Sequence, residues 1–184
     1  MLLQREKSQI LMVDVQERLL PAMAQAAQVV GNGARLLEGA RLLAVPVLVS
    51  EQYPQGLGRT VPELAQMAPA NAVHEKLEFS CYANPGLRAA LSGGDGSGDG
   101  RQTILFGIEA HVCVLQTALE MAEAQCDVTV VADAISSRSE QSKAIAMQRL
   151  LAAGVRLATT EMVLFEWLRR AGSPEFKAVS RLIR

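Results

Sequence analysis

The feature that most constrains the fold of this chain is a repeated alternation of short apolar runs with longer segments of helical periodicity. The first run, residues 8–14 (SQILMVD), is almost continuously apolar and ends on an acid. Such a run is typical of a strand buried on both faces of a parallel sheet. Residues 25–44 then carry apolar side chains at roughly helical spacing. Repetition of this pair predicts β–α–β units with right-handed connections.

The same pattern recurs along the chain and predicts six strands with helices between them. The expected strands are residues 8–14, 45–50, 71–76, 102–107, 127–133 and 155–159. The expected helices are residues 25–44, 62–67, 84–91, 111–125, 139–153, 160–169 and 174–183. We therefore expect an α/β fold of three layers, α/β/α, built on a mostly parallel, six-stranded, Rossmann-like sheet.

The domain organisation follows from the length and from the continuity of the pattern. A chain of 184 residues favours a single domain, and we expect it to cover residues 1–184. One stretch, residues 92–100 (SGGDGSGDG), has low complexity and no apolar side chain. Because the pattern resumes directly after it, this stretch is predicted to be a flexible surface loop rather than a domain linker.

The charge balance and the cysteine content argue against several classes of protein. With 18 basic and 19 acidic side chains the formal net charge is −1, which gives no electrostatic footprint for nucleic acid or for an anionic membrane. No apolar run approaches the ~20 residues that span a bilayer, and we find no signal-peptide pattern. Three widely spaced cysteines do not form a disulfide framework. We therefore expect a reducing, cytoplasmic setting.

Three reactive side chains are expected at the carboxyl ends of strands, where ligands bind in open parallel sheets. Asp14 ends the first strand, Lys76 ends the third, and Cys113 lies at the start of the helix after the fourth. A helix N-terminus and a nearby ammonium can lower the pKa of a thiol from about 8.5 to roughly 3.5–7.5. Cys113 is therefore a candidate nucleophile, with Lys76 stabilising its thiolate and Asp14 transferring protons.

Backbone N–H groups in the turn before Cys113 would face a tetrahedral oxyanion, and the whole set suits acyl transfer through a thioester. Each side chain alone also has a structural explanation. Asp14 would cap a turn, Lys76 would lie on a solvated face, and Cys113 would pack in the core. The residue pattern by itself leaves both a hydrolytic α/β enzyme and an α/β binding domain open.

Several sequence blocks match a known family, namely ILMVDVQ, HEKLEFSCY, GIEAHVCVLQTALE and VVADAISSRS, together with EQYPQGLGRT and PEFKAVSRLI. On these blocks the chain resembles the isochorismatase-like cysteine hydrolase superfamily over nearly its whole length. The blocks SEQYPQGLGRTVPEL and DAISSRS are most similar to the isochorismatase-domain-containing subgroup, whose physiological substrates are mostly unassigned.

The resemblance implies a catalytic triad of Asp14, Lys76 and Cys113, the same three residues that the strand ends select. It also implies a cis peptide bond between Ile108 and Glu109. The backbone N–H groups of Glu109 and Cys113 would then form the oxyanion hole. Family members commonly carry a small polar residue at position 109, so the glutamate is a departure from the family pattern.

The resemblance also bears on the reaction and the assembly. Nicotinamidases of this superfamily bind a metal through an Asp and two His near the second strand, where this chain reads SEQYPQG without histidine. We therefore expect no catalytic metal and no cofactor. Isochorismatases proper tend to lack the nucleophilic cysteine, so Cys113 favours hydrolysis of an amide-type C–N bond in a small-molecule substrate. The family further suggests a homo-oligomer, either a dimer or a larger assembly.

Five further residues are expected to belong to the substrate pocket. Gln52, Tyr53 and Phe79 follow strand ends, and His111 lies two positions before the predicted nucleophile. Gln16 is expected either to orient the acid of the triad or to cap the next helix.

Two alternative functions stay open at this point. One is a non-catalytic protein of the same fold that binds a small molecule or acts as a scaffold. The other is an isochorismatase-type vinyl ether hydrolase that uses Asp14 and Lys76 without the cysteine.

Overall fold

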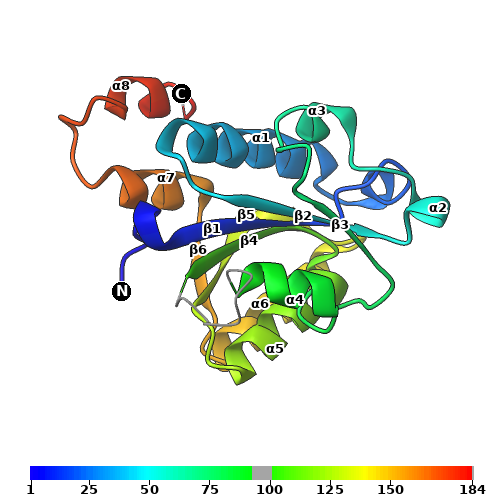
Figure 1. The fold of residues 1–184 in the computed structure, drawn as a ribbon. Coiled ribbons are helices and arrows are strands. Elements are labelled where there is room, and N and C mark those ends of the chain that lie inside the picture. The colour runs from blue at the N-terminus through cyan, green and yellow to red at the C-terminus, as the bar shows by residue number, and fades with distance from the viewer. Residues whose placement is uncertain (93–100, 184) are drawn as a thin grey trace.

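The computed structural model describes residues 1–92 and 101–183, and it has the expected three layers (Figure 1). Its centre is a six-stranded sheet in the order β3-β2-β1-β4-β5-β6, in which every neighbouring pair is parallel. The strands are β1 (Ser8–Val13), β2 (Val47–Gln52), β3 (Val73–Lys76), β4 (Gln102–Ile108), β5 (Val128–Ser136) and β6 (Arg156–Ala158). Apart from its first position, the loop predicted at residues 92–100 lies outside the described residues.

Helices cover both faces of the sheet, and each layer packs its own apolar cluster against it (Figure 1). One layer consists of α1 (Ala26–Leu43), α3 (Pro62–Ala65), α7 (Thr160–Leu168) and α8 (Phe176–Ser180). The other layer consists of α4 (Pro85–Leu91), α5 (Leu115–Glu123) and α6 (Glu140–Ala152). Short helical turns complete the chain at η1 (Arg5–Lys7), η2 (Leu20–Ala22), α2 (Pro54–Leu57) and η3 (Ala110–Val114).

The central strands explain the continuous apolar runs of the sequence. All six residues of β1 and all seven residues of β4 are buried, because helices cover both faces of these strands. A strand in that position has no solvent-facing side and shows no polar alternation. Helix α1 instead buries a single stripe, which includes Val29, Leu36 and Leu43, and its other side faces solvent.

The strand order creates a position at one edge of the sheet where a ligand can bind. β1 pairs with β2 on one side and with β4 on the other, so the direction of chain progression reverses between β1 and β4. In open α/β sheets ligands bind at this switch point, beyond the carboxyl ends of the strands. Asp14 directly follows β1, and the turn η3 that holds Cys113 follows β4 after Glu109.

Strand β5 extends further than the sequence predicted. It runs to Ser136 rather than ending at Asp133, because the end of β4 pairs with Ile135 and Ser136 after a shift in register. Asp133 therefore lies within the strand, and its carboxylate accepts hydrogen bonds from the backbone N–H and the hydroxyl of Thr160 at the start of α7.

The helix predicted for residues 111–125 also differs. It begins as a wide π-helical turn, η3, and regular α-helix starts only at Leu115. Cys113 consequently lies inside this turn rather than at the N-terminus of a regular helix. The last predicted helix, residues 174–183, is shorter and covers only Phe176–Ser180.

β1 and β4 approach each other closely at Gly107. This residue has φ 126°, a conformation that side chains rarely adopt, and it pairs with Val13 across the ladder. A Cβ at this position would collide with the backbone carbonyl of Val13. Only glycine fits here, because both the backbone conformation and the neighbouring strand exclude a side chain.

We expect Gly107→Ala to lower the free energy of unfolding by about 3 kcal/mol or more, because it adds a backbone clash to an unfavourable φ. Urea denaturation followed by circular dichroism measures this loss. Gly154→Ala is the matched control, because Gly154 has φ 77° but no heavy atom of the described chain within 4 Å of the Cβ that alanine would add; it should cost only ~1–2 kcal/mol. Equal losses for the two variants would contradict the importance of the clash.

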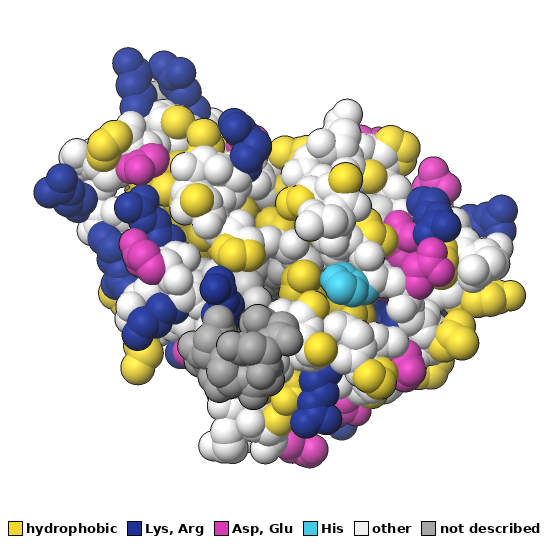
Figure 2. Space-filling view, viewed as in Figure 1, with side chains coloured by type: hydrophobic (Ala, Val, Ile, Leu, Met, Phe, Trp, Pro, Cys, Tyr) yellow, Lys and Arg dark blue, Asp and Glu magenta, His cyan; other side chains and the backbone are white. Residues whose placement is uncertain are grey.

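The surface carries mixed charge. Acidic, basic and apolar side chains are interspersed over the face shown in Figure 2, in keeping with the formal net charge of −1. Within residues 1–92 and 101–183, no helix has both the length and the apolar character needed to cross a bilayer.

Candidate active site

The structure brings the three predicted strand-end residues to one edge of the sheet, and two of them form a buried ion pair. The Nζ atom of Lys76 lies 2.7 Å from Oδ2 of Asp14, and both side chains have an exposed fraction of 0%. β2 separates the strands that carry these residues. The long lysine side chain therefore reaches across β2 to the acid that follows β1.

The ammonium of Lys76 has three further acceptors. Its Nζ donates to Oε1 of Gln52 at 2.7 Å and lies within 3.2 Å of the carbonyl oxygens of Glu78 and Phe79. Burial is the largest single influence on the pKa of Lys76 and lowers it, but the charge and hydrogen bond of Asp14, together with the neighbouring Cys81 and Cys113, outweigh burial and raise the pKa above its ordinary value of 10.5. Lys76 is therefore an ammonium at neutral pH, held in place by its acceptors.

The carboxylate of Asp14 has a second donor on β2. The hydroxyl of Ser50 donates to Oδ1 of Asp14 at 2.7 Å, so each carboxylate oxygen of Asp14 accepts a hydrogen bond. Asp14 has φ 51°, a left-handed conformation that aspartate tolerates better than most residues, and this turns the chain sharply after β1. The turn directs the carboxylate across the end of β2.

Cys113 faces this ion pair, and its setting corrects the prediction of a resting thiolate. The residue is 5% exposed. Burial raises the pKa of its thiol, and the charge and hydrogen bond of Asp14 raise it further, while Lys76 opposes the effect only in part. Lys76 is already paired with Asp14, so it does not stabilise a thiolate as a free cation would. At neutral pH the sulfur is therefore protonated, with a carboxylate beside it.

The peptide bond between Ile108 and Glu109 is cis, at the position that the resemblance implies. The side chain of Glu109 is buried, and its carboxylate forms a bidentate ion pair with the exposed guanidinium of Arg138, at 2.9 and 3.0 Å. A large charged residue fits at position 109 because Arg138 neutralises it.

The five predicted pocket residues have different surroundings. Gln16 is fully buried, and its amide bonds the backbone of Gln52 at both N–H and carbonyl and also the carbonyl of Gly58. The side-chain amide of Gln52 accepts a hydrogen bond from Nζ of Lys76 and donates one to the carbonyl of Leu77. Both glutamines therefore hold the site together from inside, and the structure does not place Gln16 on a pocket wall.

The other three predicted pocket residues lie nearer the surface. Tyr53 and Phe79 are both about half exposed, and Tyr53 lines a cavity of about 440 Å³ that also reaches Lys76. His111 is partly buried, and its Nδ1 lies 2.9 Å from the hydroxyl of Ser137. This contact ties the turn that carries Cys113 to the end of β5.

Sequence reasoning missed Ser50 and Arg138. Ser50 and Gln52 are two positions apart on β2, so their side chains lie on the same face of the strand. That spacing at the end of a buried strand was the available signal for Ser50. The ion pair of Arg138 with Glu109 joins two distant segments, and no local sequence pattern predicts it.

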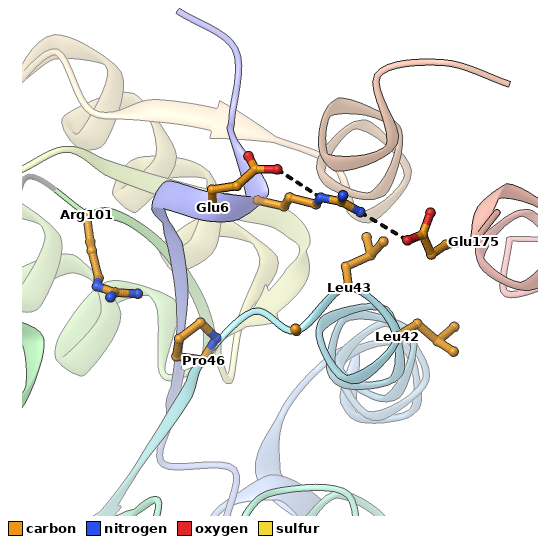
Figure 3. A pocket seen from close by; sticks show the side chains of 8 residues that line it. Glu6, Leu42, Leu43, Pro46, Arg101 and Glu175 are labelled. Carbon is orange, nitrogen blue, oxygen red and sulfur yellow. Dashed lines mark hydrogen bonds and ion pairs between the residues drawn. The ribbon is translucent and has the colours of Figure 1, made fainter. Parts of the chain in front are cut away.

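Another cavity, of about 530 Å³, lies at the amino ends of the strands, far from this edge (Figure 3). Arg5 lies on its wall between the carboxylates of Glu6 and Glu175, at 3.0 and 3.4 Å. Because both of its neighbours are acids, the charge of Arg5 is already balanced, and we assign no function to this cavity.

Comparison with known proteins identifies the family. The family model for the isochorismatase domain matches residues 8–162. Isochorismatase domain-containing protein 2 of Danio rerio is 42% identical over 176 residues, which cover 96% of this chain and 86% of the relative. Isochorismatase domain-containing protein 1 of the same fish is also 42% identical, over 93% of this chain, but this chain spans only 59% of the length of that relative.

Solved structures show the same fold. A MAR1 ribonuclease from Caenorhabditis elegans is 34% identical, with a TM-score of 0.90 over 100% of this chain and 92% of that chain. YcaC of Escherichia coli, described as an octameric hydrolase of unknown specificity, is 25% identical with a TM-score of 0.90, over 99% and 89% of the two chains. YcaC of Pseudomonas aeruginosa, solved with covalent acrylamide, is 25% identical with a TM-score of 0.87, over 99% and 95%. The family match and these relatives show that the chain belongs to the isochorismatase family.

Proposed function

We propose that this protein is a metal-independent cysteine hydrolase that cleaves an amide-type C–N bond of a small molecule through a thioester. The observation that carries the proposal is the buried contact of 2.7 Å between Asp14 and Lys76, which lies beside the thiol of Cys113. A buried ion pair next to a thiol has little structural value of its own, because desolvation offsets most of its attraction. Its position at the switch point of the sheet favours a role in chemistry.

In the proposed first step the sulfur of Cys113 attacks the substrate carbonyl while its proton passes to the carboxylate of Asp14. The raised pKa of the thiol makes this proton transfer part of the attack rather than an earlier, separate event. Backbone N–H groups of Glu109 and Cys113 would bind the oxyanion. Lys76 would hold the carboxylate and balance the charge that develops on sulfur.

The tetrahedral intermediate then expels the amine, which takes the proton from Asp14, and a thioester remains on Cys113. Water attacks this thioester after giving a proton to Asp14. Collapse of the second intermediate breaks the C–S bond and returns the proton to the sulfur, so the enzyme regains its starting state. The products are a carboxylic acid and an amine.

The relatives support parts of this proposal. The solved YcaC with covalent acrylamide shows that a protein of this fold can react covalently with a small electrophilic amide. The octameric YcaC supports the proposal that this chain also assembles into a homo-oligomer. All three cysteines are free, in keeping with a proposed location in a reducing compartment such as the cytoplasm.

A trapping experiment tests the proposal. The protein is incubated with a panel of small amides, ureides and a single-stranded RNA, the last because a relative is named a ribonuclease. Samples are quenched in acid and analysed by intact-mass and peptide mass spectrometry. We expect at least one amide to be hydrolysed with a transient acyl adduct on Cys113, and no adduct in Cys113→Ser. Turnover without a cysteine adduct, or turnover of RNA alone, would count against the proposal.

A further inference from the structure

A second cysteine is linked to Asp14 through one intervening side chain, but it is not placed to act as a nucleophile. Cys81 follows β3 in the chain and is fully buried. Its backbone N–H donates to Oγ1 of Thr117 on α5 at 2.8 Å, which fixes its position. Burial raises the pKa of its thiol to about 11. Cys81 is therefore a neutral thiol at physiological pH, and its burial shields the sulfur from substrate.

The thiol of Cys81 contacts the residue that contacts Asp14. Its Sγ lies 3.4 Å from Oγ of Ser50, and Ser50 in turn donates to Oδ1 of Asp14 at 2.7 Å. The three side chains thus form one buried chain of hydrogen bonds, which runs from the loop before α4, through β2, to the end of β1.

The direction of this chain is fixed by which groups can donate. The carboxylate of Asp14 can only accept, so the hydroxyl proton of Ser50 points toward it. The oxygen of Ser50 can then accept a hydrogen bond on the side of Cys81, and the thiol of Cys81 donates it. Without the thiol, the buried oxygen of Ser50 would lack this donor.

Lys76 holds the other carboxylate oxygen of Asp14. Its Nζ bonds Oδ2, while Ser50 bonds Oδ1. A carboxylate held at both oxygens cannot rotate about its terminal torsion, which is otherwise soft. The orientation of Asp14 toward the thiol of Cys113 therefore depends on both donors together.

We infer that Ser50 and Cys81 are positioning residues that fix the carboxylate of Asp14 for proton transfer from Cys113. The inference rests on the proposed function, since it requires Asp14 to accept that proton. Cys81 acts through Ser50, and Ser50 acts on Asp14 directly. Neither residue touches the substrate, and the only proton that moves in the attack is that of Cys113.

The test uses iodoacetamide as a probe of Cys113, so that it needs no identified substrate. Alkylation forms a C–S bond on Cys113, releases iodide and requires loss of the thiol proton. The second-order rate at pH 7 is measured by peptide mass spectrometry for the wild type, Ser50→Ala, Cys81→Ala and Cys81→Ser. Cys126, which is partly exposed, serves as the internal reference in every sample.

We expect Ser50→Ala to slow alkylation of Cys113 by about tenfold or more, in line with the loss of one hydrogen bond to a charged group. Cys81→Ala should slow it by a smaller factor, about threefold, because it acts at one remove. Cys81→Ser should keep the wild-type rate, because serine also donates a hydrogen bond. Serine and alanine are close in size, so the two variants differ mainly in the presence of this donor. The rate at Cys126 should stay constant throughout.

Two results would overturn the inference while leaving the proposed function intact. One is a wild-type rate at Cys113 in Ser50→Ala. The other is an equal slowing in Cys81→Ser and Cys81→Ala, which would show that Cys81 matters only for packing. If wild-type Cys113 were not alkylated at all while Cys126 was, the proposed function and this inference would both fall.

Discussion

Lys76→Met is expected to lower the free energy of unfolding by about 3–5 kcal/mol. The substitution leaves the carboxylate of Asp14 fully buried without its cationic partner. It also removes the donor from Oε1 of Gln52 and from two backbone carbonyls. An uncompensated buried charge is among the most costly defects that a single substitution creates. Urea denaturation monitored by circular dichroism measures the loss.

The double variant Asp14→Asn with Lys76→Met is the control for this prediction. It removes both charges at once, and asparagine also tolerates the left-handed backbone at position 14. We expect the free energy of unfolding of the double variant to lie within about 1–2 kcal/mol of the wild-type value and well above that of Lys76→Met alone. Removing both charges of a buried ion pair costs less than removing one and leaving its partner uncompensated. Losses that simply add would show that the two residues do not depend on each other.

The same ion pair predicts how stability depends on pH. The folded-state pKa of Lys76 is raised above its ordinary value of 10.5. A group whose pKa rises on folding contributes stability that is fully present below the unfolded value and is lost as pH rises through the folded value. The contribution of Lys76 to the stability of the wild type should therefore be constant at neutral pH and be lost only above about pH 10.5, which urea denaturation of the wild type over this pH range measures.

Cys113→Ala is expected to reduce kcat by at least about 1,000-fold for any amide that the wild type hydrolyses, because no other group can form the thioester. The rate is measured as release of amine, which a coupled colour reaction detects. The variant should stay folded, since removing one sulfur from a site that is 5% exposed leaves only a small cavity. A melting temperature measured beside the activity checks this point.

This variant also separates the proposed function from its two alternatives. Activity that survives Cys113→Ala would point to a vinyl ether hydrolase that relies on Asp14 and Lys76. An absence of turnover on every substrate, combined with thermal stabilisation by a ligand in wild type and Cys113→Ala alike, would point to a binding protein. A loss of turnover with retained ligand binding is the result that the cysteine mechanism requires.

Local sequence determined the architecture of this protein. The buried runs at β1 and β4 are apolar throughout because helices cover both faces of those strands, and that rule can be read without coordinates. Acid, lysine and cysteine at three strand ends could also be found in this way, since parallel strands bring their carboxyl ends to one edge. The three residues that the pattern selected do lie together.

Only the tertiary structure decided the protonation state of Cys113 and the contacts that hold the site in place. Whether the sulfur of Cys113 is a thiol or a thiolate depends on burial and on whether Lys76 is free or already paired with Asp14, and neither can be read from spacing. The contacts of Ser50 with Cys81, and of Glu109 with Arg138, join segments that are far apart in the chain. Sequence periodicity reports which side chains are buried, but the strength of an electrostatic interaction depends on distances of a few ångströms that only packing fixes.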